Sequence, residues 1–109
     1  MKKLLAAILF VPVMAHAEFK TGNELLSDMQ SENIVNKMAA LGYIMGVTDA
    51  LRGTTHCPPA EVTAGQLRDM IKSTLESAPQ IRHYTADAIV SAVLGKAWPC
   101  ANKKSGVGA

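Results

Sequence analysis

The sequence contains few of the residues that metal binding and covalent catalysis require. Its 109 residues include two cysteines and three histidines, and none of these form a close Cys-x-x-Cys or His-x-x-x-His spacing. Because zinc sites are built from such closely spaced ligands, we expect no metal and no other cofactor. His56 and Cys57 are adjacent, but no third residue is evident that would orient them as a base and a nucleophile. The chain is therefore not expected to be an enzyme.

The sequence also lacks a strong excess of charge of either sign. It contains 11 Lys and Arg residues against 9 Asp and Glu residues, and two of the basic residues are Lys2 and Lys3. Without these two, basic and acidic residues are equal in number, so the remainder of the chain is about neutral. Nucleic-acid-binding domains present a basic face, and the sequence shows no such face. No nucleic acid partner is expected.

Beyond the N-terminus, the sequence has no charge-free run long enough to cross a membrane. The N-terminal apolar run, from Leu4 to Val13, is about half of the roughly 20 residues that a spanning helix needs. It follows Lys2 and Lys3 and precedes Ala15-His16-Ala17, an order that is typical of a secretory signal peptide and its cleavage signal. We therefore expect residues 1–17 to be a cleaved signal peptide and the product to be exported, with no membrane insertion after cleavage.

The two cysteines, Cys57 and Cys100, are expected to form a disulfide. Export places the chain in an oxidising compartment, where paired cysteines are ordinarily joined. Closing so long a loop contributes roughly 4 kcal/mol to stability in the chain-entropy model. A domain of about ninety residues has a marginal core, so this bond is expected to matter for folding.

Helical patterns account for most of the remaining sequence, and no strand pattern or internal repeat is evident. Capping-box motifs begin at Thr21 and Thr63. We expect helices beginning after Thr21, from about Glu32 to Leu51, from Thr63 to about Ser77 and from Thr85 to Ala97, with Pro79 ending the third or starting a short turn. Residues 18–100 are thus predicted to form a single all-α domain, a small four-to-five-helix bundle stapled by the disulfide, with no sheet. Residues 101–109, rich in Lys, Ser and Gly, are predicted to be a disordered tail.

Apolar residues recur at helical spacing in the first, third and fourth of these helices, which marks the faces that are expected to form the core. The inward residues are Leu25, Leu26 and Met29 in the first, Leu67, Met70, Ile71, Thr74 and Leu75 in the third, and Ala86, Ile89, Val90, Val93, Leu94 and Ala97 in the fourth. In the third helix, charged residues lie largely outside the apolar stripe, which predicts one buried and one solvated side.

The second helix is apolar on nearly every side. One stripe contains Ile34, Met38, Leu41 and Met45, and another contains Val35, Ala39, Gly42 and Gly46. A helix with two apolar stripes is expected to be covered by neighbours on two sides. Gly42 and Gly46 each cost up to about 1 kcal/mol relative to Ala, so we expect them to be helix-packing positions where another helix approaches closely, within the fold or in a second copy.

Two short segments are candidates for contact with a partner, and the outer face of the third helix is a further candidate. Gly53 predicts the end of the second helix, and the polar loop that follows, to Val62, is expected to be held in place by the disulfide. Its candidate contact residues are Thr54, Thr55, His56, Pro58 and Pro59. The second segment is Arg82, His83 and Tyr84, since arginine and aromatic residues are common anchors in interfaces. The alternative for Tyr84 is a packing role at the start of the fourth helix.

Several segments, taken in order, resemble one protein family. They are Thr21-Gly22-Asn23-Glu24-Leu25-Leu26, Leu41-Gly42-Tyr43-Ile44-Met45-Gly46-Val47-Thr48-Asp49-Ala50, and Cys57-Pro58 followed by Val62-Thr63-Ala64-Gly65-Gln66-Leu67 and ending in Ala97-Trp98-Pro99-Cys100. The chain resembles the Rap/Tai family of immunity proteins, the periplasmic antidotes to type VI secretion amidase effectors. The resemblance extends over nearly the whole chain after the predicted signal peptide.

This resemblance implies a small all-helical, disulfide-bonded protein of the periplasm that is commonly a homodimer. Such a protein binds a cysteine amidase that cuts peptidoglycan, and it blocks the active-site cleft of that enzyme without performing chemistry itself. Relatives often carry a further cysteine pair, in the first helix and just before the Gly-Tyr-Ile segment, where this sequence has Met29 and Ala40. Two apolar residues fit a lost disulfide whose site has become part of the core, since a lone thiol is a liability.

An alternative reading is a periplasmic acid-stress chaperone resembling the HdeA class. Proteins of that class are also small, helical and held by one disulfide. A fall in pH would unfold or dissociate such a protein and expose its apolar surface. Prevention of aggregation near pH 2 to 3 but not at pH 7 distinguishes this function from immunity.

Overall fold

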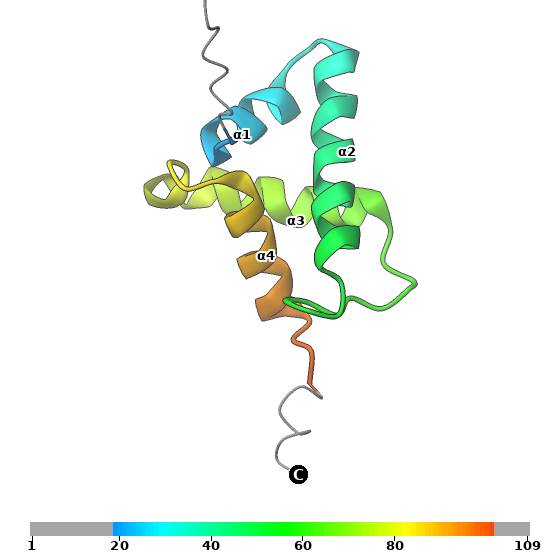
Figure 1. Cartoon of the computed structure of the whole chain (residues 1–109). Coiled ribbons are helices and arrows are strands. Elements are labelled where there is room, and N and C mark those ends of the chain that lie inside the picture. The colour runs from blue at the N-terminus through cyan, green and yellow to red at the C-terminus, as the bar shows by residue number, and fades with distance from the viewer. Residues whose placement is uncertain (1–18, 102–109) are drawn as a thin grey trace, which may run out of the picture.

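Four α-helices and one short 3-10 helix follow one another in residues 19–101, the part of the chain described by the structure, a computed structural model (Figure 1). They are α1 (Gly22–Gln30), α2 (Ile34–Leu51), α3 (Ala64–Ser77), η1 (Pro79–Ile81) and α4 (Ala86–Ala97). Each α-helix packs against the other three, and α3 lies across the bundle behind α2 and α4 in Figure 1. The prediction of an all-α bundle is confirmed. The predicted signal peptide and most of the predicted tail lie outside the described residues.

Local sequence signals set the starts of α1 and α3. The Thr21 hydroxyl accepts a hydrogen bond from the backbone N–H of Glu24 at 3.2 Å, and the Glu24 carboxylate accepts from the backbone N–H of Thr21 at 2.9 Å. Thr63 and Gln66 form the same reciprocal pair, at 3.1 and 2.7 Å. Both predicted capping boxes are therefore confirmed.

The start of α2 lies two residues later than predicted, at Ile34, because Asn33 caps the helix. Its side-chain oxygen accepts a hydrogen bond from the backbone N–H of Val35 at 2.8 Å. This bond satisfies one of the backbone donors that the first turn of a helix leaves without a partner.

The start of α4 is held by a segment distant in sequence. Thr85 occupies the N-cap position, but its side chain makes no capping hydrogen bond. Three backbone hydrogen bonds instead join the N-terminal segment to this region: Ala86 N–H to the Lys20 carbonyl at 2.7 Å, Gly22 N–H to the Tyr84 carbonyl at 2.9 Å, and Asn23 N–H to the Arg82 carbonyl at 2.9 Å. They satisfy donors at the starts of both α1 and α4.

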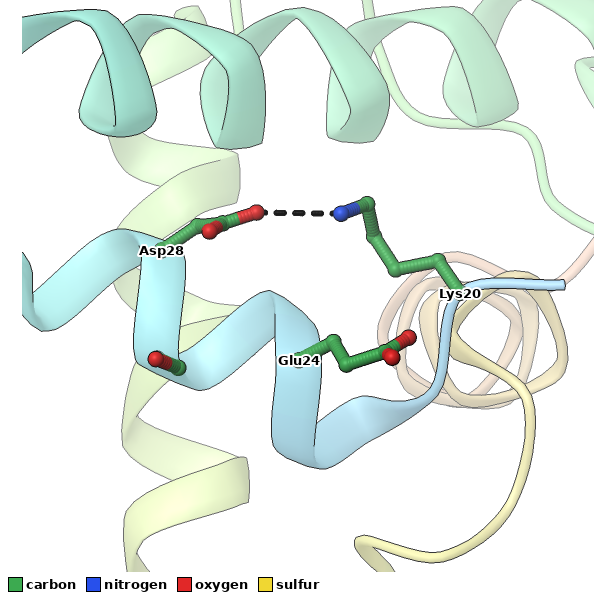
Figure 2. Close-up of a pocket in the computed structure, with 4 residues that line it drawn as sticks. Lys20, Glu24 and Asp28 are labelled. Atoms are coloured by element: carbon green, nitrogen blue, oxygen red, sulfur yellow. Dashed lines mark hydrogen bonds and ion pairs between the residues drawn. The ribbon is translucent and has the colours of Figure 1, made fainter. Parts of the chain in front are cut away.

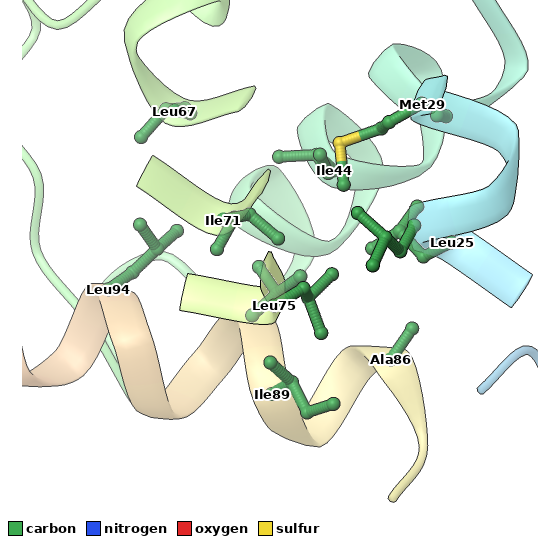
Figure 3. Close-up of a cluster of buried hydrophobic side chains, with 12 residues drawn as sticks. Leu25, Met29, Ile44, Leu67, Ile71, Leu75, Ala86, Ile89 and Leu94 are labelled. Carbon is green, nitrogen blue, oxygen red and sulfur yellow. The ribbon is translucent and has the colours of Figure 1, made fainter. Parts of the chain in front are cut away.

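All four helices contribute side chains to one hydrophobic core (Figure 3). The buried residues are Leu25, Leu26 and Met29 of α1, Ala40 and Ile44 of α2, Leu67, Ile71 and Leu75 of α3, and Ala86, Ile89, Val90 and Leu94 of α4. Most of the residues that were predicted to face inward from α1, α3 and α4 are buried. In α4, however, Val93 is only partly buried and Ala97 is exposed. Met29 and Ala40 both lie in this core, and their replacement of a second disulfide stays an interpretation.

The predicted burial of α2 is wrong in its details. Its buried residues are Ala40, Ile44 and Thr48, spaced four apart, and they belong to neither of the two expected stripes. Ile34 and Met38 are 65% and 56% exposed. Thr48 satisfies its buried hydroxyl by donating to the Ile44 carbonyl at 2.7 Å. Neighbours within the described chain cover only one side of this helix, because α1, α3 and α4 all pack on the side of Ile44.

Candidate partner-binding surfaces

The loop between α2 and α3 is held to the C-terminal end of α4. Cys57 and Cys100 form the predicted disulfide, and the Cys57 backbone N–H donates to the Trp98 carbonyl at 2.8 Å. A Cβ atom on Gly95 of α4 would lie 2.8 Å from the Thr55 carbonyl oxygen, so only glycine permits this approach of loop and helix. The loop is therefore fixed by one covalent bond, one backbone hydrogen bond and one close contact.

The side chain of His56 fixes the loop from the inside. It is fully buried, with Nε2 3.1 Å from the Thr48 carbonyl oxygen and Nδ1 2.8 Å from the Thr55 hydroxyl. Because a carbonyl oxygen can only accept, Nε2 carries the proton and donates to Thr48, while Nδ1 accepts from Thr55 in the neutral ring. The ring thereby attaches the loop to α2, which removes His56 from the predicted contact residues.

Pro58 is also buried, whereas Thr54, Thr55 and Pro59 are exposed. The Pro58 carbonyl accepts a hydrogen bond from the Arg52 guanidinium at 2.7 Å. Of the five predicted contact residues in this loop, three are therefore exposed, and they lie on a backbone that is fixed at several points.

The residues of the second predicted segment differ in role: one supports the fold and two are exposed. The Arg82 guanidinium donates to the carbonyl groups of Leu75 and Glu76 at 2.6 and 3.0 Å, so it satisfies the end of α3. His83 and Tyr84 are exposed, with ring centroids 4.2 Å apart. Sequence reasoning did not anticipate the role of Arg82, because the carbonyl groups that it binds become adjacent only in the folded chain.

The two predicted segments lie at opposite ends of α4. The loop is attached near the C-terminal end of this helix, and Tyr84 lies just before its first residue. A helix of 12 residues is about 18 Å long, so the segments do not form one compact site. Between them, Tyr84 lines a shallow apolar groove of about 220 Å³ with Ile81, Ala88, Ile89, Ala92 and Val93.

The outward face of α2, defined here as Val35, Ala39, Gly42 and Gly46, is exposed. Val35 is 68% exposed, and a Cβ atom on either glycine would meet no atom of the described chain within 4 Å. The two glycines therefore do not serve close packing within the fold. The remaining part of that prediction, close approach by a second copy, stays a prediction.

A polar hollow beside α1 is lined by Lys20, Glu24, Ser27 and Asp28 (Figure 2). The Lys20 ammonium forms an ion pair with Asp28 at 3.0 Å, and Glu24 is engaged in the capping box of α1. Both carboxylates thus have structural partners. An acid and a base free for proton transfer are not arranged here.

Tyr43 of α2 lies close to the same region. Burial raises the pKa of its phenol above the ordinary value of 10.0, and the Asp87 carboxylate raises it further, while a hydrogen bond with the Asp87 backbone lowers it. The Lys20 ammonium lies 6.0 Å from the ring centroid, at the outer limit of a cation–π contact. Tyr43 is therefore a neutral packing residue between α2 and α4 at physiological pH.

Residues 19–101 contain no group of three or more His, Cys, Asp or Glu side chains placed to hold a metal ion. Among the helices described, none has both the length and the apolar character needed to span a membrane. Surfaces of the described residues that are available to a partner include the loop between α2 and α3, the groove beside Tyr84 and the exposed apolar residues of α2.

The family comparison agrees with this arrangement. The family model described as Rap1a immunity proteins matches residues 21–100, from the capping threonine of α1 to the second cysteine of the disulfide. No curated protein and no solved structure matches the chain. The match contains every helix of the bundle and most of the chain. This chain belongs to the family of Rap1a immunity proteins.

Proposed function

We propose that this chain is a periplasmic immunity protein that binds a peptidoglycan-cleaving amidase effector of type VI secretion and occludes its active site. The family match over residues 21–100 carries the proposal, because immunity proteins act by binding a secreted effector. The signal-peptide pattern at the N-terminus and the disulfide both favour an oxidising compartment outside the cytoplasm.

The loop between α2 and α3 is the first candidate for the occluding contact. Its exposed candidate residues include Thr54, Thr55 and Pro59, and they lie on a backbone that the disulfide and buried His56 already hold in one conformation. A fixed loop loses little conformational entropy on binding, which favours affinity. Tyr84, 54% exposed at the other end of α4, is the second candidate.

The protein is further proposed to be a homodimer through the outward face of α2. The four residues of this face, Val35, Ala39, Gly42 and Gly46, carry no charge and extend over about 17 Å of helix. The absence of side chains at the two glycines allows the backbone of a second helix to approach closely. In a two-fold dimer, the same face of each copy meets the other.

A protection experiment tests the proposed function. A peptidoglycan-cleaving amidase effector of type VI secretion is directed to the periplasm of a sensitive host, and survival is measured with and without the full-length chain. We expect protection by the chain with its N-terminal segment and loss of protection when residues 1–17 are deleted. Equal protection without export would contradict the periplasmic mechanism, and no protection in either form would contradict immunity to that amidase.

A further inference from the structure

A groove between α2 and α3 combines an apolar floor with a basic rim. It is about 310 Å³ in volume and is also bordered by the end of α1. Its apolar lining residues, called the floor here, are Met29, Ile34, Met38 and Leu41, and its charged lining residues, called the rim, are Lys37, Arg68, Asp69 and Lys72. None of these residues belongs to the loop or to the outward face of α2, so the groove is a separate surface.

The floor of the groove exposes side chains that a soluble monomer would ordinarily cover. Ile34 and Met38 are 65% and 56% exposed, while Met29, which also lines the groove, is buried in the core. Contiguous apolar exposure rimmed by polar residues is typical of a docking surface. Methionine side chains are flexible and polarisable, which suits the floor to a partner side chain of variable shape.

The charges of the rim are unequal. Three cationic side chains border the groove against one carboxylate, and that carboxylate, Asp69, is paired with the Arg68 guanidinium at 3.1 Å. Lys37 and Lys72 form no ion pair with any residue in 19–101. The two free ammonium groups therefore leave a net positive field around an apolar floor.

We propose that this groove binds an apolar side chain flanked by carboxylates on the surface of the effector. The proposal rests on the proposed function and adds the chemistry of one contact to it. The apolar side chain fills the floor, and the flanking carboxylates pair with Lys37 and Lys72, so shape and charge are both complementary. A second copy fits less well, because a two-fold interface at the groove would place one basic rim against another.

A peptide titration tests the groove without the effector. The protein is purified from the periplasm, labelled with ¹⁵N, and titrated with three seven-residue peptides: leucine flanked by glutamates, leucine flanked by lysines, and serine flanked by glutamates. The first peptide is expected to shift backbone amides of residues 34–41 and 65–72 and to bind about tenfold more tightly than either of the others. Its affinity should fall as ionic strength rises.

Equal binding of all three peptides, or no shift at these residues, would overturn the proposal. Shifts of the amides of residues 65–72 that depend on protein concentration alone would also overturn it, because a second copy would then cover the side of the groove that lies away from the proposed dimer face. Each result thus supports or excludes the acidic, apolar occupant.

Variants separate the rim from the floor. The double variant Lys37→Glu, Lys72→Glu is expected to weaken binding of the glutamate–leucine peptide about tenfold and to reverse its salt dependence. Met38→Gln is expected to weaken it about threefold while leaving the salt dependence unchanged. The matched control is Lys96→Glu, because Lys96 is exposed on α4 and does not line the groove. An unchanged affinity in the double variant would overturn the role of the rim.

The protection experiment then connects the groove to the effector. If the native chain protects cells and the Lys37→Glu, Lys72→Glu variant protects at least about tenfold less, the groove contacts the effector. If both protect equally, the immunity function stands and the groove proposal fails. If the native chain does not protect, the immunity function fails, and the peptide titration alone decides what the groove binds.

Discussion

α2 and α3 bury similar faces but differ in what lies on the other side of each helix. α3 buries Leu67, Ile71 and Leu75, and it presents polar and charged side chains to solvent. α2 buries Ala40, Ile44 and Thr48, yet it presents an uncharged outward face and the exposed Ile34 and Met38 to solvent. Charged residues identify the solvated side of α3, whereas no such residues identify it in most of α2. An apolar pattern therefore predicts burial within a chain only where polar residues mark the opposite side.

The largest expected effect on stability concerns the disulfide that joins the loop between α2 and α3 to the C-terminal end of α4. Replacing both Cys57 and Cys100 with Ala should lower the free energy of unfolding by roughly 4 kcal/mol, because the unfolded chain regains the freedom of a 43-residue loop. Denaturant unfolding under oxidising conditions measures this change. In reductant, native and variant proteins should have the same stability, and a difference there would assign the loss to packing.

The next largest effect is the loss of stability on truncating a buried isoleucine of α2, compared with an exposed isoleucine of the same helix. Ile44→Ala should cost about 3 kcal/mol, because it leaves a cavity in the core where Ile44 is fully buried. Ile34→Ala removes the same atoms from a side chain that is 65% exposed, and it should change stability by less than about 0.5 kcal/mol. Thermal or denaturant unfolding of the two variants provides the comparison. Equal losses would show that the outer side of α2 is covered in solution.

A substitution on the outward face of α2 tests the second copy. Gly42→Leu meets no atom of the described chain and replaces a poor helix former, so the monomer should gain up to about 1 kcal/mol. The same side chain should block close approach of a partner helix and dissociate the dimer, as measured by sedimentation. Ser73→Leu, at an exposed position of α3, is the control and should leave the oligomeric state unchanged. A native protein that sediments as a monomer would refute the dimer.

The smallest effect is a pH dependence at Tyr43. Its pKa is raised in the folded state above 10.0, first by burial and then by Asp87, so the folded state holds the phenolic proton more tightly than the unfolded state does. The stability that this provides is complete below pH 10 and is lost as pH rises through the folded pKa. Tyr43→Phe should reduce this alkaline loss. Unfolding curves measured between pH 9 and 11 test the difference, and identical pH profiles would contradict it.

The features that could be predicted from sequence are those fixed by neighbouring residues. Thr21 with Glu24, and Thr63 with Gln66, cap their helices through bonds three residues apart, and the stripe of α3 is marked by the charges around it. The residues that determine each capping box are at most three positions apart, and the stripe is marked by charges on the same helix, so these features can be predicted from local sequence. The helix order and the all-α fold followed from them, and the disulfide followed from the cysteine count in a chain expected to be exported.

The candidate contact surfaces were harder to predict, because exposure depends on distant segments. Nothing local indicates that His56 is buried against Thr48 or that Arg82 satisfies the end of α3. The basic rim likewise depends on the placement of Lys37 of α2 beside Lys72 of α3. Tertiary packing decides each of these cases, and one sequence without aligned relatives provides no direct signal for it.

The hydrogen bonds between the N-terminal segment and the start of α4 also constrain the order in which the chain can fold. Lys20 and Gly22 find their partners only at Ala86 and Tyr84, more than sixty residues later. Contacts of such high sequence separation slow folding relative to a bundle stabilised by local contacts, because loop-closure entropy must be overcome first. When the chain is delivered with its N-terminus first, the start of α1 therefore lacks its backbone hydrogen-bond partners until nearly all of the domain is present. Completion of these contacts is a late event, and the disulfide is later still, because Cys100 follows Ala86 in the chain.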